Sequence, residues 1–293
     1  MIKVKLKEVK LREEGMTDIA NEKVVEKTAD PFVLKEQKGT TLHITLNRPK
    51  ALNALSMGML NALQEALDPI FEDNSIKALI IKGSGKGFCA GHDLKEMQSH
   101  REDDDKGKAY FEGLFATCTK MMLTLAKLPI PVIAEIHGVA AAAGCQLVAS
   151  CDLAIAEDST IFAVNGIDAG LFCSTPQVAL SRNIPRKAAL EMLMLGERIN
   201  AERALSLGLL NRVVAKENLA ETAEHFAEKA AMRSRNVIAL GKQAFYNQIE
   251  LSLEQAYKVM GETIVDNLMM PDADCGMEAF IEKKKPEWPS ENQ

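Results

Sequence analysis

A glycine-rich stretch, GSGKGFCAG at residues 83–91, follows an apolar run and is typical of turns that bring backbone N–H groups close to a ligand. A phosphate-binding P-loop would need glycine at position 80 and serine or threonine directly after the lysine, but Ile80 and Gly87 stand there. A dinucleotide-binding fingerprint fits loosely, as Gly85-x-Gly87-x-x-Ala90, but residues 95–108 offer no second strand that ends in an acidic side chain. The remaining interpretation is a tight turn whose N–H groups face a ligand oxygen.

A second set of backbone donors is expected where residues 140–149 begin a helix. The first N–H groups of a helix lack intrahelical partners and lie at the positive end of its dipole, which suits an oxygen that gains negative charge. Two such donors directed at one carbonyl oxygen form an oxyanion hole. The alanine run 140–143 fits close helix packing equally well, so the residues alone leave both interpretations open.

Alternating strands and helices must position these two segments. The apolar runs 42–46, 78–81, 131–134 and 153–156 predict short buried strands, and helices are expected over 56–68, 110–128 and 140–149. Ser56 and Asn200 are expected to cap helices at their N-termini. This alternation predicts an α/β fold with parallel strand pairing.

Composition divides the chain into three regions. Residues 1–38 form a charged extension, residues 39–216 form the α/β core, and residues 217–293 are helical and rich in methionine and alanine. The extension mixes lysine and glutamate with a lone Arg12, which fits neither a secretory signal nor a transit peptide. We therefore expect a cytoplasmic protein, or a mitochondrial matrix protein if the source is a eukaryote.

Several functional classes are disfavoured by composition. The formal net charge of -6 argues against a nucleic-acid partner, and no apolar stretch is long enough for a membrane span. Six cysteines without a C-x-x-C pair and five scattered histidines predict buried free thiols and no metal site.

Motifs in a fixed order along residues 35–286 resemble those of the crotonase (enoyl-CoA hydratase/isomerase) superfamily. The segments are LNRPKALNAL at 46–55, FCAGHDLKEM at 88–97, HGVAAAAGC at 137–145, CD at 151–152, GERI at 196–199, GLLN at 208–211 and MEAF at 277–280. The resemblance implies a ClpP-like spiral of ββα units in residues 39–216. It also implies a helical region, residues 217–293, that assembles trimers or dimers of trimers.

The same resemblance implies a substrate and the residues that hold it. It implies an acyl-CoA lyase or isomerase of fatty acid metabolism, with coenzyme A as part of the substrate and no further cofactor. The backbone N–H groups of His92 and Ala143 would form the oxyanion hole. Residues implied to contact the acyl-CoA are Lys50, Ala51, Leu52, Ala90, Asp93, Leu94 and, from a neighbouring chain, Phe280 and Lys283. Asp93 is also a plausible helix N-cap, which we favour for its side chain.

The sequence departs from the family pattern at the two glutamates that serve hydratases as general base and acid. Gln146 and Gly166 stand at those positions. A glutamine amide can orient water but cannot accept its proton, and glycine offers no side chain.

Two functions remain open. One is an enzyme with relocated acid–base groups, for which Asp168 is the first candidate and the side chains of His92, Cys173 and Ser174 are others. The other is a non-catalytic acyl-CoA-binding or regulatory protein. An RNA-binding role is distant, because the acidic balance provides no obvious basic helix.

Overall fold

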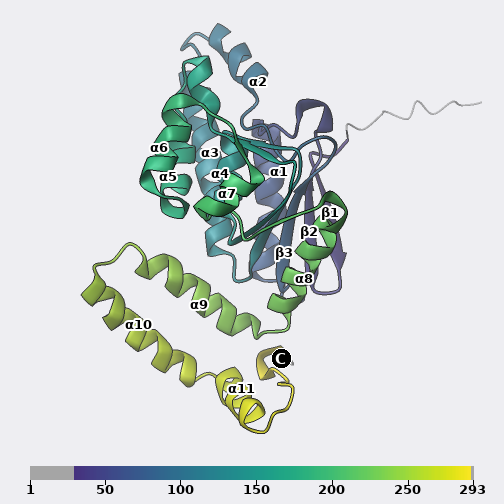
Figure 1. The fold of residues 1–293 in the computed structure, drawn as a ribbon, viewed down its shortest axis with the longest axis vertical. Coiled ribbons are helices and arrows are strands. Elements are labelled where there is room, and N and C mark those ends of the chain that lie inside the picture. The colour runs from purple at the N-terminus through teal and green to yellow at the C-terminus, as the bar shows by residue number, and fades with distance from the viewer. Residues whose placement is uncertain (1–29, 292–293) are drawn as a thin grey trace, which may run out of the picture. The chain divides into compact units, whose positions relative to one another are not determined.

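The computed structural model describes residues 30–291, and Figure 1 shows their arrangement. Residues 1–29, most of the expected charged extension, lie outside the described residues. The compact unit discussed below begins at Pro31.

A six-stranded sheet forms the centre of this unit, in the order β1-β2-β3-β4-β6-β9. Its strands are β1 (Val33–Lys38), β2 (Thr41–Leu46), β3 (Ala78–Gly83), β4 (Val132–Ile136), β6 (Leu153–Glu157) and β9 (Arg212–Val214). From β2 to β9 every neighbouring pair is parallel, which confirms the predicted parallel pairing. Only β1 is antiparallel to its neighbour β2.

Strand β1 corrects the expected boundary of the extension. The sequence placed residues 33–38 in the weakly structured N-terminal region, but they pair with β2 along its whole length. The signal was hidden because β1 is an edge strand, and most of its side chains are exposed and polar.

Helices cover both faces of this sheet. On one face, α1 (Met57–Leu67), α3 (Lys108–Lys127) and α4 (Ala143–Ser150) contribute to the main hydrophobic core. Ser56 accepts a hydrogen bond from the Met59 N–H, so it caps α1 as predicted. On the other face, α8 (Leu219–Ala231) buries Leu219, Ala223 and Ala227 against β3, β4 and β6.

The position of α8 also corrects a boundary. The sequence assigned all residues after 216 to the helical oligomerisation region, but α8 completes the covering of the sheet. The amphipathic pattern of α8 does not distinguish packing on its own sheet from packing on another chain, so only the tertiary structure could assign it.

A smaller sheet carries the chain into α4. It contains β5 (Val139–Ala141), β7 (Ile161–Ala163) and β8 (Ile199–Asn200), in that order. The sequence predicts that the helix begins at residue 140, and this is wrong. Ala140 and Ala141 pair with β7, and the helix begins at Ala143.

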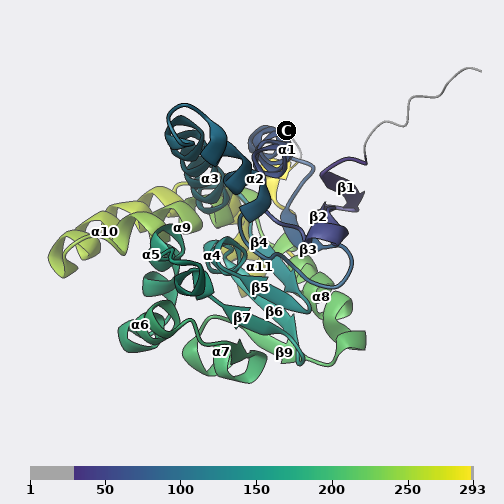
Figure 2. The ribbon, with the colours of Figure 1, turned by 90° about the horizontal axis from the view of Figure 1, so that it is seen from above.

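The remaining helices follow the core in sequence. They are α2 (Leu94–Ser99), α5 (Ser174–Asn183), α6 (Arg186–Leu195), α7 (Ala201–Leu207), α9 (Arg235–Gln248), α10 (Leu253–Leu268) and α11 (Pro271–Ile281). Asn200 caps α7 through a hydrogen bond from the Arg203 N–H, as predicted. Figure 2 shows α4 beside α5, and α9 beside α10.

A buried polar contact joins α9 to the core. The Lys242 Nζ lies 2.6 Å from Asp152 Oδ2, and the Tyr246 hydroxyl donates to Asp152 Oδ1 over 2.9 Å. Lys242 also donates to the carbonyls of Leu125 and Ile130, so its buried ammonium group is fully partnered.

None of the helices in residues 30–291 combines the length and apolar character that crossing a membrane requires.

Candidate functional site: two backbone donors between adjoining segments

The loop that ends at His92 lies directly against the start of α4. A methyl group added at Gly91 would lie 3.2 Å from the Ala143 nitrogen, and one added at Gly144 would lie only 2.1 Å from the Cys89 carbonyl oxygen. The contact is continued by two backbone hydrogen bonds, from Cys89 N–H to Val139 O and from Ala141 N–H to Cys89 O. The glycines are therefore needed because any side chain would separate the two segments.

The two N–H groups expected as oxyanion donors are unpaired. Within the part of the chain that the structure describes, neither the His92 nor the Ala143 N–H has a hydrogen-bond acceptor. Their neighbours are paired: Ala142 N–H donates to Ala163 O over 2.8 Å, and Asp93 N–H donates to Leu55 O over 3.3 Å. Two adjacent segments thus each offer one free donor.

Backbone strain occurs directly before the second donor. Ala142 has φ 47° and ψ -115°, a conformation that a residue with a side chain rarely adopts. Such strain costs on the order of 1–3 kcal/mol and persists only where the surroundings enforce it. At Ala142 it turns the chain sharply from β5 into α4, so that the Ala143 N–H begins the helix.

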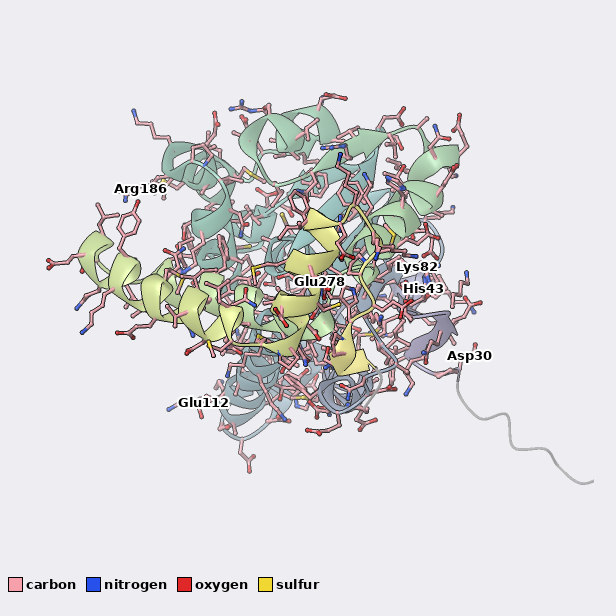
Figure 3. All side chains as sticks on the ribbon, turned by 90° about the horizontal axis from the view of Figure 1, so that it is seen from below. Asp30, His43, Lys82, Glu112, Arg186 and Glu278 are labelled. Atoms are coloured by element: carbon pink, nitrogen blue, oxygen red, sulfur yellow. The ribbon has the colours of Figure 1, made fainter. Side chains whose placement is uncertain are left out.

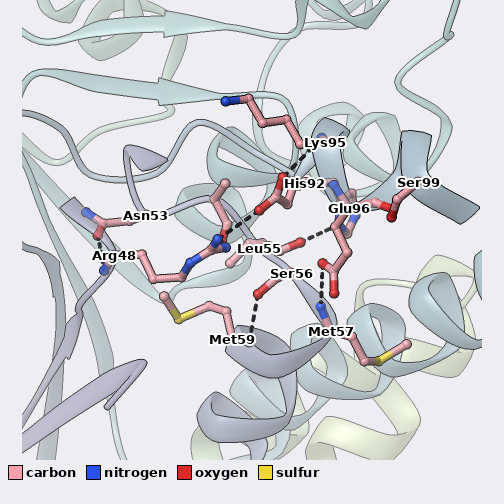
Figure 4. A network of polar contacts seen from close by, with 12 residues as sticks. Arg48, Asn53, Leu55, Ser56, Met57, Met59, His92, Lys95, Glu96 and Ser99 are labelled. Atoms are coloured by element: carbon pink, nitrogen blue, oxygen red, sulfur yellow. Dashed lines mark hydrogen bonds and ion pairs between the residues drawn. The ribbon is translucent and has the colours of Figure 1, made fainter. Parts of the chain in front are cut away.

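The glycine-rich loop that ends at His92, residues 83–92, is called the first donor loop below. Residues 48–55 hold this loop, as Figure 4 shows. The Arg48 guanidinium donates to Asp93 Oδ2 over 2.9 Å and to the Ala54 carbonyl over 3.1 Å. The buried side-chain amide of Asn53 donates to the carbonyls of Ser84, Gly87 and Phe88 at 2.8–3.1 Å. This segment is the first of the family motifs, but its pattern alone predicts no role for Arg48 or Asn53.

The Asp93 side chain has a structural task. Its Oδ1 accepts the N–H groups of Lys95 and Glu96, so it caps α2, the interpretation that the sequence favoured. Burial by itself would raise the pKa of Asp93, but the hydrogen bonds from the Glu96 N–H and the Arg48 guanidinium outweigh it and hold the pKa below its ordinary value. Asp93 is therefore an ionised anchor.

The His92 side chain turns toward protein rather than water. Its Nδ1 lies 3.2 Å from the Leu55 carbonyl, and its ring meets Phe115 edge to face at 5.1 Å. Burial lowers the pKa of His92, although the contact with Leu55 O opposes this. The imidazole is thus neutral at pH 7, with Nδ1–H donating to Leu55 O and a buried Nε2 that has no partner among the described residues.

Gln146 and Gly166 are the residues expected at the positions of the hydratase carboxylates, and neither side chain can accept a proton. Gln146 is 6% exposed, and its Oε1 has no hydrogen-bond partner within residues 30–291. Gln146 lies three residues after Ala143 on α4, so the two share one helix face. A methyl group at Gly166 would lie 2.8 Å from Cys173 Sγ and 2.7 Å from the Leu171 carbonyl oxygen. The Cys173 thiol therefore occupies the space that a side chain at position 166 would need.

The other acid–base candidates are less well placed. Asp168 is exposed in a 3-10 turn, where Asn165 donates to it over 3.4 Å. Ser174 is exposed and donates to Phe172 O. Burial raises the pKa of the Cys173 thiol despite a hydrogen bond from the Gly166 N–H, so the thiol is protonated at pH 7.

The expected coenzyme A contacts fall into two groups. Lys50, Ala51 and Leu52 lie on an exposed turn, and the Ala90 N–H donates to the Leu52 carbonyl over 2.9 Å, which joins this turn to the first donor loop. Leu94 is exposed at the start of α2. Phe280 is 85% exposed on α11, and Lys283 follows that helix. In Figure 1, α11 lies beyond α9 as seen from α2, so one chain does not bring Phe280 and Lys283 to the first donor loop.

A second buried polar cluster lies on the opposite face of the sheet. His43 Nε2 is 2.9 Å from Glu224 Oε1, and Figure 3 shows His43 near Lys82. Burial lowers the pKa of His43, with Glu224 opposing and Lys82 reinforcing the change. Because α8 covers this cluster, it is separate from the donor site.

Comparison with known proteins identifies the family of this chain. The family model described as enoyl-CoA hydratase/isomerase matches residues 36–291. Enoyl-CoA hydratase domain-containing protein 3 from Xenopus laevis is 46% identical over 258 residues, which cover 88% of this chain and 86% of the relative. The human protein of that name is 47% identical over 249 residues, covering 85% and 80% of the two chains.

Solved structures show the same fold. An enoyl-CoA hydratase from Mycobacterium smegmatis superimposes with a TM-score of 0.84 at 50% identity, covering 88% of this chain and 99% of that one. The human domain-containing protein 3 superimposes with a TM-score of 0.83 at 44% identity, covering 88% and 100%. The fold is therefore that of the crotonases, as the motifs predicted, and the chain belongs to the enoyl-CoA hydratase/isomerase family.

Proposed function

We propose that this protein binds acyl-CoA thioesters and polarises the thioester carbonyl between the N–H groups of His92 and Ala143. The observation that carries the proposal is that two backbone N–H groups without acceptors among the described residues lie on segments in direct contact. A carbonyl oxygen that receives both hydrogen bonds becomes more negative, which makes the acyl group more electrophilic and its α-protons more acidic. Loss of one such donor typically costs about 3 kcal/mol of transition-state stabilisation.

The proton-transfer half of the hydratase reaction is missing from this site. Gln146 can hold a water molecule through its amide but cannot deprotonate it, and Gly166 contributes no group. General acid–base assistance is worth roughly 10²–10⁴-fold for each group. We therefore propose a protein that binds and polarises enoyl-CoA but hydrates it poorly.

A non-catalytic acyl-CoA-binding or regulatory role is the second candidate. The observation in its favour is the state of the alternative acid–base groups: Asp168 is exposed and the Cys173 thiol is protonated. An enzyme with relocated groups would need one of them, or the Nε2 of His92, to approach the acyl chain.

Assembly and compartment are proposed by analogy. We propose a homotrimer or dimer of trimers, in which Phe280 and Lys283 of one chain contact the coenzyme A of another. Their exposure, and their separation from the donor loop of the same chain, support this arrangement.

The frog and human relatives are named as mitochondrial proteins. We propose the mitochondrial matrix for this chain if its source is a eukaryote, which an import assay with isolated mitochondria would test.

Binding and turnover can be measured separately. Cinnamoyl-CoA should bind and show a red-shifted absorbance, because polarisation of the carbonyl draws electrons from the conjugated ring. A CoA thioether without the carbonyl should bind more weakly. Hydration of crotonyl-CoA should stay well below the rate of about 10 s⁻¹ that is typical of enzymes.

Binding without a red shift would refute the oxyanion hole. Hydration at or above that typical rate would show that another acid–base pair has replaced the two glutamates, and Asp168→Asn and His92→Gln would then identify its members.

A further inference from the structure

The side-chain amide of Asn53 lies within hydrogen-bond distance of three carbonyls of the glycine-rich loop. Its Nδ2 lies 2.9 Å from Ser84 O, 2.8 Å from Gly87 O and 3.1 Å from Phe88 O. Its Oδ1 accepts the Arg48 N–H over 2.9 Å and lies 3.5 Å from Ser84 Oγ. Asn53 has no exposed surface, so water does not compete for these contacts.

The backbone conformation at this position also favours asparagine. Asn53 has φ 56°, in the left-handed region that asparagine tolerates better than most residues with a side chain. The preceding Leu52 is also left-handed, with φ 48°. Two consecutive left-handed residues turn the chain back, and the Asn53 amide then lies beneath the glycine-rich loop.

The contacts of Asn53 are continued by its neighbours. Leu55 N–H donates to Gly91 O over 2.7 Å, and Asp93 N–H donates to Leu55 O, so residues on both sides of His92 are bonded to the same short segment. The ion pair from Arg48 to Asp93 closes the arrangement at 2.9 Å. Residues 48–55 therefore hold the chain on both sides of the peptide that contains the His92 N–H.

We propose that Asn53 is a positioning residue for the first oxyanion donor, and that through it the turn at residues 50–52 is coupled to the thioester site. The inference rests on the proposed function. Asn53 itself touches no substrate. It fixes the carbonyls of Ser84, Gly87 and Phe88 in the loop that leads to His92, so that the His92 N–H faces the same point as the Ala143 N–H. Without it, Ser84 and Phe88 keep the hydrogen bonds of their N–H groups to Leu46 O, His137 O and Val139 O, but the carbonyls of Ser84, Gly87 and Phe88 lose the side chain that links them.

Through this coupling, the exposed turn at residues 50–52 also influences the position of the first donor loop. Leu52 accepts the Ala90 N–H through its carbonyl, and Asn53 follows it directly. A ligand that orders residues 50–52 therefore also orders the loop that carries the donor. The polarisation of a bound thioester should then depend on whether the ligand contacts this turn.

The test compares Asn53→Gly with wild type, using cinnamoyl-CoA at saturating concentration. Glycine keeps the left-handed backbone and removes every side-chain hydrogen bond. The expected result is a red shift reduced to less than half of the wild-type value, with a dissociation constant that changes less than about threefold. Asn183→Ala is the matched control, because it also loses two amide-to-carbonyl hydrogen bonds, to Ala149 and Ala179, away from the first donor loop. It should keep the full shift.

A folded Asn53→Gly protein with the wild-type red shift at saturation would overturn the inference, as would one whose only defect is affinity. If Asn53→Gly does not fold, Arg48→Lys decides, because lysine keeps the charge but cannot contact Asp93 and Ala54 together. A reduced shift in Arg48→Lys supports the coupling, and an unchanged shift overturns it. Absence of any red shift in wild type would instead refute the proposed function itself.

Discussion

The Cys173 sulfur lies where a side chain at Gly166 would have to begin, since a Cβ on that glycine would be 2.8 Å from it. The Leu171 carbonyl oxygen is as close, at 2.7 Å. A side chain at position 166 could be excluded either by a left-handed backbone angle or by lack of space. Gly166 has no such left-handed angle, and the obstacle is space.

Gly166→Glu should therefore destabilise the protein by roughly 1–3 kcal/mol, the usual cost of overpacking. Cys173→Ala in the same chain should recover part of this loss, because it removes one of the two obstructing atoms. Urea denaturation of the two single variants and the double variant measures the coupling. Additive effects would show that the thiol does not obstruct position 166.

Gly144→Ala should separate the two donor segments. Its methyl group would overlap the Cys89 carbonyl oxygen at 2.1 Å, and backbone cannot move aside without breaking the contact between loop and helix. We expect a loss of at least about 2 kcal/mol of stability and a loss of the cinnamoyl-CoA red shift. Gly241→Ala is the control, since no atom lies within 4 Å of its added methyl group. In the interior of α9 it should raise stability by up to about 1 kcal/mol. Equal behaviour of the two variants would contradict the packing described for the site.

Ala142→Gly should relieve the strain before the second donor. Glycine adopts φ 47° without penalty, which gains about 1–3 kcal/mol, but it costs roughly 0.5–1 kcal/mol through the entropy of the unfolded chain. The net effect should be unchanged or increased stability. Ala149→Gly, inside α4, should instead lose about 1 kcal/mol or more. Thermal denaturation distinguishes the two, and a clear destabilisation by Ala142→Gly would show that residue 142 is not strained.

Asp93→Asn should weaken the protein in a pH-dependent way. The pKa of Asp93 is lower in the folded state than in the unfolded chain, so its contribution is present above the unfolded-state pKa of about 3.9. It is lost as pH falls through the folded-state pKa. The variant should be about 1–2 kcal/mol less stable than wild type at pH 7. That difference should shrink below pH 4, as urea denaturation at pH 7, 4 and 3 would reveal. A difference independent of pH would mean that the ionised carboxylate is not the stabilising form.

Assembly through α10 and α11 should be visible in solution. Tyr257 on α10, Met269 after it and Ile281 on α11 are each at least 75% exposed in the single chain. Three chains of 32.1 kDa would give about 96 kDa by light scattering, or twice that as a dimer of trimers. Met269→Glu should shift the distribution toward single chains, whereas Leu34→Glu on β1 should not. A wild-type monomer at micromolar concentration would contradict the proposed trimer.

The sequence by itself determined the parallel core strands, the helix caps at Ser56 and Asn200, and the family. These features depend on short apolar runs, local capping chemistry and ordered motifs, all of which are readable along the chain. That Gln146 and Gly166 stand at the positions of the hydratase glutamates stays a prediction from the sequence. The sequence did not determine that β1 pairs with β2 or that α8 covers the sheet. The residue pattern of an exposed edge strand or an amphipathic helix does not specify which element packs against it.

Only the tertiary structure decided how the donor site is held. Asn53 and Phe88 are 35 residues apart, and Arg48 and Asp93 are 45 apart, so no local pattern could connect them. The same holds for the Cys173 thiol beside Gly166 and for the strain at Ala142, where β5 must pair with β7 before α4 begins. Contacts of this kind arise from packing between segments that are far apart in the sequence. The residue pattern within one segment therefore does not reveal which other segment it contacts.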